Sequence, residues 1–93
     1  MKLSKILEVD CLRTIYLLYI SGGKLRFSEI AKTFASRSSL SSCLKDLEEN
    51  DIIKRKVVAE EKPVKVYYFL TEKGRQVGLH LDKIRKLVFN DEQ

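Results

Sequence analysis

The stretch from Phe27 to Ile53 constrains the fold more than any other part of the sequence. Its pattern predicts two short amphipathic helices joined by a tight, serine-rich turn. Ser28 is expected to cap the first helix, and Ser36 the second, because short hydroxyl side chains accept hydrogen bonds from free N–H groups at helix starts. The second helix is expected over residues 37–49. Its apolar residues recur at i, i+3, i+4 and i+7, which defines one buried stripe: Leu40, Cys43, Leu44 and Leu47.

The opposite side of this second helix is unusual in carrying many small hydroxyls beside two bases. Its members are Arg37, Ser38, Ser39, Ser41, Ser42 and Lys45. Serine is a mediocre helix former, so several serines on one face need a reason. Hydroxyls let a helix backbone approach another surface closely and can donate to phosphate or base edges. The alternative is an ordinary solvated face.

The elements around this pair of helices indicate a mixed α+β domain. A helix is expected over residues 3–20, a short basic strand over 24–26, and a last helix over 72–89. Two β-branched segments, 52–58 and 64–70, read as the strands of a hairpin with a polar loop between them.

The two terminal helices carry many apolar residues on more than one side, and dimerisation would add buried area to a domain of this size. Gly74 and Gly78 lie inside the last helix, where each costs up to about 1 kcal/mol relative to alanine. Such glycines make sense where another element packs closely against the early turns.

Ninety-three residues form one domain, expected over 1–93, with a formal net charge of +5 that favours a polyanionic partner. The sequence contains no apolar run long enough to span a bilayer and no signal-peptide pattern, so we expect a soluble, intracellular protein. Cys11 and Cys43 with the single His80 do not make a zinc site. No nucleophile–base pair or phosphate-binding glycine loop is present, so we expect neither an enzyme nor a cofactor, and no small-molecule ligand is evident.

The order of elements and three sequence motifs resemble winged helix-turn-helix transcription regulators of the MarR, HxlR and PadR kind. The motifs are L-x-x-L-E at residues 44–48, the aliphatic pair Ile52-Ile53 with Arg55, and Y-x-L-T-x-x-G-R at residues 68–75. The resemblance covers residues 25–76, and the chain's size is also similar to small winged-helix proteins of archaea and their viruses. Asp51 stands where these families place a glycine before the aliphatic pair.

The resemblance implies a homodimeric regulator that binds double-stranded DNA, with the terminal helices, residues 3–20 and 72–89, forming the dimer interface. It would place recognition helix 37–49 in the major groove and wing 54–70 on the backbone or in the minor groove. Residues carried over as DNA contacts are Ser28, Lys32, Arg37, Ser38, Ser39, Ser41, Ser42, Lys45, Lys54, Arg55, Lys56, Lys62 and Lys65.

Two alternatives stay open. Because fold does not fix function, a winged helix can bind protein instead of DNA, and Asp46, Glu48 and Glu49 on the recognition helix would favour that. The cysteines read either as buried apolar thiols or, in a protein from a hyperthermophile, as an intersubunit disulfide. In the second case Cys11 would pair with Cys43 or with its own symmetry mate.

Overall fold

A computed structural model describes residues 8–34 and 36–89. The chain forms α1 (Val9–Ile20), β1 (Lys24–Arg26), α2 (Phe27–Ala31), α3 (Arg37–Glu49), β2 (Ile53–Val58), β3 (Lys65–Leu70) and α4 (Glu72–Phe89). The α+β winged helix-turn-helix fold predicted from the sequence is confirmed. None of the described helices combines the length and apolar composition that a membrane span needs.

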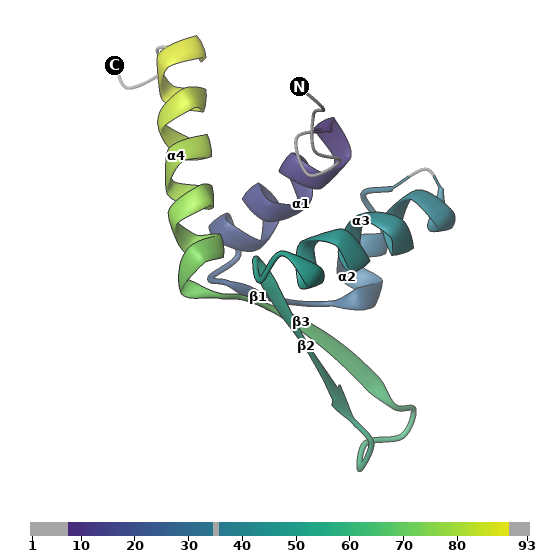
Figure 1. The fold of residues 1–93 in the computed structure, drawn as a ribbon. Coiled ribbons are helices and arrows are strands. Elements are labelled where there is room, and N and C mark those ends of the chain that lie inside the picture. Colours follow the sequence, from purple (N-terminus) through teal and green to yellow (C-terminus); the bar gives the residue numbers. More distant parts are fainter. Residues whose placement is uncertain (1–7, 35, 90–93) are drawn as a thin grey trace.

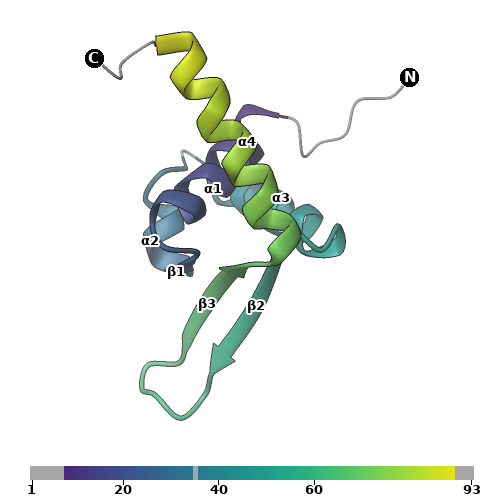
Figure 2. The same cartoon turned by 90° about the vertical axis from the view of Figure 1, so that its left-hand side faces the viewer.

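The three strands form one antiparallel sheet in the order β1-β3-β2. Register pairs Lys24 with Phe69 across one edge of β3 and Lys54 with Phe69 across the other. Helices α1, α2 and α3 gather on one side of the sheet, while the β2–β3 hairpin projects beyond them as the wing (Figure 1). α4 rises from the end of β3, away from the tip of the wing (Figure 2).

The core lies where these three helices meet the inner face of the sheet. Its apolar residues come from the three helices and from β2 and β3 with the residue before β2: Cys11, Ile15, Leu18, Ile30, Leu40, Cys43, Leu44, Leu47, Ile52, Ile53, Tyr68 and Leu70. The predicted stripe of α3 is buried in full, which explains why this helix forms at the predicted bounds.

Two predicted helix starts are corrected. α1 begins at Val9, and residues 3–7 of the expected helix lie outside the described residues. α2 begins at Phe27 with Arg26 as its cap, so Ser28 lies in the first turn and does not cap the helix. The cause is Glu29, whose carboxylate accepts a hydrogen bond from the Arg26 backbone N–H at 2.8 Å.

The glycines of α4 have close neighbours, as expected. A Cβ on Gly78 would lie 2.7 Å from the ring of Tyr19 in α1, and one on Gly74 would collide with the Ile52 carbonyl oxygen. These contacts bring α4 against α1 and against the start of β2. The first turns of α4 are therefore fixed to the winged domain.

Candidate nucleic-acid interface

α3 is held at both ends by specific hydrogen bonds. At its start the Ser36 side chain accepts from the Ser39 backbone N–H at 3.3 Å, as predicted for a cap. At its end, Ile52 N–H donates to Leu47 O at 2.9 Å and Asp51 N–H to Glu48 O at 3.1 Å. This pattern is a Schellman motif, and Asp51 takes the left-handed conformation, φ 62°, that usually belongs to glycine. The turn of the resembling families is thus kept without their glycine.

One side of α3 brings several of the predicted DNA-binding residues together. A hollow of about 230 Å³ lies between α3 and the sheet, lined by Phe27, Ser41, Leu44, Lys45, Glu48, Arg55 and Tyr68. A neighbouring hollow of about 510 Å³ is lined by Phe27, Ser28, Ala31, Lys32 and Arg37. Phe27 lies between the two hollows. We define the surface of Ser28, Lys32, Arg37, Ser41, Lys45 and Arg55 as the recognition face.

The remaining serines of α3 lie elsewhere. Ser38, Ser39 and Ser42 line a separate hollow of about 240 Å³ together with Glu8, Asp10 and the two cysteines. The Ser38 and Ser36 hydroxyls are 2.9 Å apart and form a hydrogen bond, so Ser38 contributes to the start of α3. The structure therefore divides the hydroxyl face that the sequence suggested into a basic half and a half beside α1.

The bases of the wing are also divided, because side chains alternate along a strand. Arg55 pairs with Tyr68 and turns toward α3, where both residues line the same hollow. Lys54 and Lys56 pair with Phe69 and Tyr67 and belong to the opposite face of the sheet. The prediction that all three bases belong to one DNA-binding surface of the wing thus requires two faces of the sheet. Of the other wing bases, Lys62 is exposed in the loop and Lys65 forms an ion pair with Glu61 at 3.1 Å.

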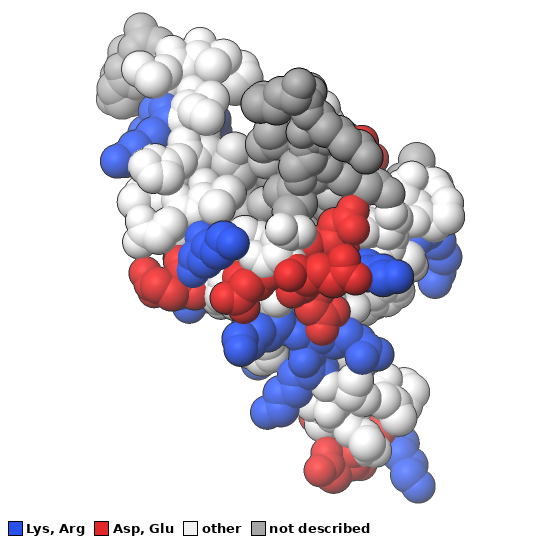
Figure 3. Space-filling view, viewed as in Figure 1, with Lys and Arg blue, Asp and Glu red and all other residues white. Residues whose placement is uncertain are grey.

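The Arg55 guanidinium lies beside the Tyr68 hydroxyl. Burial raises the pKa of Tyr68, and Arg55 opposes that rise. Glu48 also approaches this pair and lines the hollow, so the recognition face becomes less positive toward the end of α3. Figure 3 shows acidic side chains in a band above the blue side chains of the hairpin.

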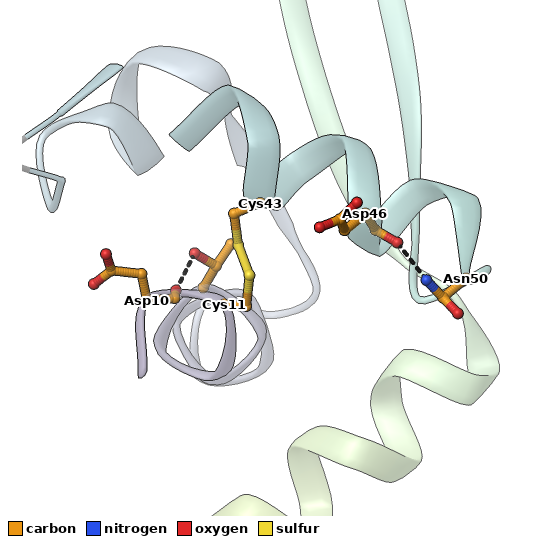
Figure 4. Close-up of a disulfide and its surroundings, with 6 residues drawn as sticks. Asp10, Cys11, Cys43, Asp46 and Asn50 are labelled. Atoms are coloured by element: carbon orange, nitrogen blue, oxygen red, sulfur yellow. Dashed lines mark hydrogen bonds between the residues drawn. A yellow bond between two sulfur atoms is a disulfide. The ribbon is translucent and has the colours of Figure 1, made fainter. Parts of the chain in front are cut away.

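Cys11 and Cys43 form a disulfide within one chain, with their Cα atoms 5.5 Å apart (Figure 4). The sequence predicts either buried thiols or a bridge between subunits. Both cysteines are buried, each only 1% exposed, and their sulfurs pair with each other within the chain. The bond joins α1 to the middle of α3. Among the described residues no cluster of His, Cys, Asp and Glu is suited to a metal ion.

A third feature is an apolar groove of about 500 Å³ between α1 and α4. Its lining residues are Val9, Leu12, Arg13, Tyr16, Leu81, Ile84, Arg85, Val88 and Phe89. Inside it, the Tyr16 hydroxyl donates to Asp82 Oδ1 at 2.8 Å and accepts from Arg85 Nε at 2.8 Å. The hydrogen bond from Tyr16 is the largest cause of the lowered pKa of Asp82, and Lys86 and Arg85 act in the same direction.

Comparison with known proteins agrees with this architecture. The HTH-type transcriptional regulator YodB of Bacillus subtilis is 50% identical over 54 residues, which are 56% of this chain and 47% of YodB. An uncharacterized HTH-type transcriptional regulator of Methanothermobacter thermautotrophicus is 38% identical over 74 residues, 77% of this chain and 56% of that protein. The chain thus spans about half the length of these curated relatives.

Solved structures show the same likeness. The reduced form of YodB superposes with a TM-score of 0.67 at 33% identity, covering 88% of this chain and 80% of that one. The redox regulator HypR in its oxidized form gives a TM-score of 0.68 at 27% identity, covering 84% of each chain.

These relatives are transcriptional regulators and not enzymes, as the sequence analysis expected. The model of the HxlR-like helix-turn-helix family matches residues 12–92. The chain therefore belongs to the HxlR-like helix-turn-helix family.

Proposed function

We propose that this protein is a transcriptional regulator that acts inside the cell and binds double-stranded DNA through the recognition face. The observation that carries the proposal is that Lys45 and Arg55 line one hollow beside α3, while Arg37 and Lys32, the residue after α2, line the neighbouring hollow. Such a face supplies guanidinium and ammonium donors for phosphate and for base edges in the major groove. Its relatives named as HTH-type transcriptional regulators support the same reading.

The charge distribution along α3 suggests how the helix enters the groove. Arg37, Ser41 and Lys45 occupy its first nine residues, whereas Glu48 and Glu49 occupy its last turn. Phosphates repel these carboxylates, so the first half of α3 enters the major groove and the last turn stays outside it. In this orientation Arg37 is the best candidate for a bidentate contact to guanine. The wing then reaches the neighbouring backbone or minor groove with Lys62 and Lys65, whereas Lys54 and Lys56 lie on the face of the sheet opposite to α3.

The functional unit that we propose is a homodimer formed through the groove between α1 and α4. Ile84, Val88 and Phe89 line it and are 55%, 67% and 69% exposed, far more than is usual for large apolar residues on one helix. A second copy would cover them. Two recognition helices related by a two-fold axis would then meet half-sites about 34 Å apart.

Fluorescence anisotropy with duplex DNA at two salt concentrations tests DNA binding. Arg37→Ala and Lys45→Ala are compared with Lys83→Ala, which removes the same charge from an exposed position on α4. Each recognition-face variant should weaken binding and reduce the slope of log K against log salt by about 0.9 per lost phosphate contact, while Lys83→Ala changes neither. Equal effects of all three variants, or a binding constant that does not depend on salt concentration, would favour the protein-binding alternative.

Sedimentation analysis tests the dimer. Ile84→Glu places a charge in the groove and should yield monomers at micromolar concentration, whereas Lys83→Glu at the adjacent exposed position should leave the dimer intact. A wild-type monomer without DNA would contradict the proposal.

A second candidate function, control of DNA binding by oxidation, is favoured by the Cys11–Cys43 bond. YodB has been solved in its reduced form and after treatment with diamide, and HypR, a redox regulator, has been solved in its oxidized form. Oxidation would remove two electrons and two protons from the two thiols, passing them to an oxidant such as diamide. The bond would then fix α3 to α1 beside the recognition face.

Duplex affinity measured with and without reductant tests this second function. A change in the wild type that is absent in Cys43→Ser would support it, and identical affinities would refute it. Non-reducing electrophoresis separates the two possible pairings, because an intrachain bond leaves the monomer band unchanged and an intersubunit bond doubles its mass.

A further inference from the structure

The face of the sheet that turns away from the core carries a distinct chemistry. Register aligns Lys24, Phe69 and Lys54 in one row across the three strands, and Arg26, Tyr67 and Lys56 in the next. Side chains of directly paired residues lie on the same face of a sheet. We define these six residues as the outer face. It consists of two aromatic rings on the central strand with a base on each side of both.

The two rings are not part of the hydrophobic core. Tyr67 and Phe69 are half-buried, and neither belongs to the core cluster nor to the apolar residues packed against it. Their observed neighbour is Lys24, whose Nζ lies 4.8 Å from the Tyr67 ring centroid and 5.7 Å from that of Phe69. In the described part of the chain, the exposed side chain of Lys24 therefore lies over both rings.

The charge of this face has one sign. Its eight strand positions hold the six residues of the outer face together with Val58 and Lys65, and so include five bases and no acid. Among the described residues only Lys65 of these five forms an ion pair, with Glu61 of the loop. The four bases of the outer face thus surround the rings without a carboxylate partner among the described residues, which favours a polyanionic ligand.

The outer face is open. Figure 2 shows the two hairpin strands broadside with no described helix in front of them, while the recognition face lies on the α3 side of the sheet. A ligand on the outer face would therefore not compete for the residues that the proposed duplex site uses.

The spacing of the rings selects among nucleic acids. Residues i and i+2 of an antiparallel strand are about 6.8 Å apart, twice the 3.4 Å rise of stacked bases in one DNA strand. Two adjacent bases that stack on the two rings are held about 6.8 Å apart and are therefore unstacked from each other, and bases of a duplex are not accessible in that way. Single strands satisfy both conditions, because their bases can be splayed and stacked on aromatic side chains.

We propose that the outer face binds single-stranded nucleic acid. Tyr67 and Phe69 each stack on one base of a short segment. Lys24 leaves the rings and contacts phosphate together with Arg26, Lys54 and Lys56. No base-specific hydrogen bond is involved, so the site accepts many sequences. This binding is separate from duplex recognition and stands whether or not the duplex proposal does.

Anisotropy with fluorescein-labelled dT12 and U12 measures the binding. With four phosphate contacts, the slope of log K against log salt should be about −2.8, and the double variant Lys54→Ala, Lys56→Ala should reduce it by about 1.4. The matched control is Arg55→Ala, which removes a base between those two positions but from the opposite face. Arg55→Ala should leave single-strand affinity unchanged.

The aromatic contribution has its own readout. Tyr67→Ala should weaken single-strand binding about 5- to 150-fold, and Tyr67→Phe, which keeps the ring, should not. A dT12 with 5-bromouracil at its centre should cross-link under ultraviolet light to Tyr67 or Phe69, as mapped by mass spectrometry. The wild-type cross-link needs no variant, so it decides the matter even if Tyr67→Ala fails to fold.

Four results would overturn the proposal. The first is a cross-link that maps to α3, and the second is loss of single-strand binding in Arg55→Ala but not in the Lys54, Lys56 variant. The third is release of dT12 by saturating duplex. The fourth is affinity for polyphosphate equal to that for dT12 and unchanged in Tyr67→Ala, which would indicate charge alone.

Discussion

Gly74 in the first turn of α4 gives the sharpest test of how the wing and the last helix fit together. Its α-carbon faces the Ile52 carbonyl, and a Cβ added there would collide with that oxygen and lie 2.8 Å from Leu70 Cδ2. The carbonyl cannot withdraw freely, because it accepts hydrogen bonds from both the backbone N–H and the hydroxyl of Thr71, each at 3.0 Å. Gly74→Ala must therefore push two backbone segments apart.

The magnitude follows from three opposing contributions. Overpacking against a fixed neighbour costs about 1–3 kcal/mol, and disturbing two hydrogen bonds costs about 1 kcal/mol each. Helix propensity returns about 1 kcal/mol on replacing glycine by alanine. The net loss is about 2–4 kcal/mol, which lowers the Tm of a chain of this length by roughly 8–32 °C.

Thermal unfolding followed by circular dichroism measures the effect. Gln76→Ala, at an exposed position of the same helix, is the control and should stay within about 0.5 kcal/mol of wild type. Gly78→Ala should fall between them, since its obstacle is the side-chain ring of Tyr19 and side chains shift more easily than backbone. A Gly74→Ala variant that is more stable than wild type would show that propensity alone governs this position and would refute the packing.

Three further predictions concern stability. Asp51→Gly should raise the free energy of unfolding by about 0.5–1 kcal/mol in urea titrations. The reasons are that glycine has no steric penalty at φ 62° and that a carboxylate is removed from the negative end of α3. Asp51→Ala keeps the steric penalty and should not raise the free energy of unfolding. The pKa of Asp82 is lowered in the folded chain, so the stability that its carboxylate contributes is complete above the ordinary carboxyl range and is lost as pH falls through the lowered pKa. Between pH 5 and pH 3 the Tm of wild type should therefore fall more than that of Tyr16→Phe. Parallel curves of Tm against pH would contradict this role of the Tyr16 hydroxyl. Reducing the Cys11–Cys43 bond, which spans 32 positions of sequence, should lower the free energy of unfolding by about 3–4 kcal/mol, and the Cys11→Ala, Cys43→Ala double variant should not respond to reductant.

The elements that the sequence predicted well are those with a local signal. α3 and α4 have the predicted bounds because each combines a capping hydroxyl with an apolar stripe of helical period. The start of the short α2 was predicted wrongly. Ser28 has the side chain of a typical cap, but the folded chain begins the helix after Arg26, whose backbone N–H donates to Glu29.

The candidate site was harder to predict, because its assembly depends on register. That Lys54 and Lys56 lie opposite to Arg55 follows from strand alternation alone, yet which face meets α3 requires the pairing with β3. Lys24 and Arg26 were not predicted as part of any site for the same reason. The pairing of Cys11 with Cys43 likewise depends on how α1 crosses α3, and no spacing in the chain specifies that crossing.

The junction after α3 has a mechanical consequence. The Thr71 hydroxyl lies 2.6 Å from the Asp51 carbonyl oxygen, and Lys73 Nζ donates to the Asn50 carbonyl at 3.0 Å, so the end of α3 and the start of α4 move as one piece. α4 has 18 residues and is therefore about 27 Å long. In the proposed dimer it acts as a lever: turning it by about 10° displaces its far end by about 5 Å, more than the 3.4 Å rise of one base pair. In such a dimer, small changes in the apolar groove would shift a recognition helix out of alignment with its half-site.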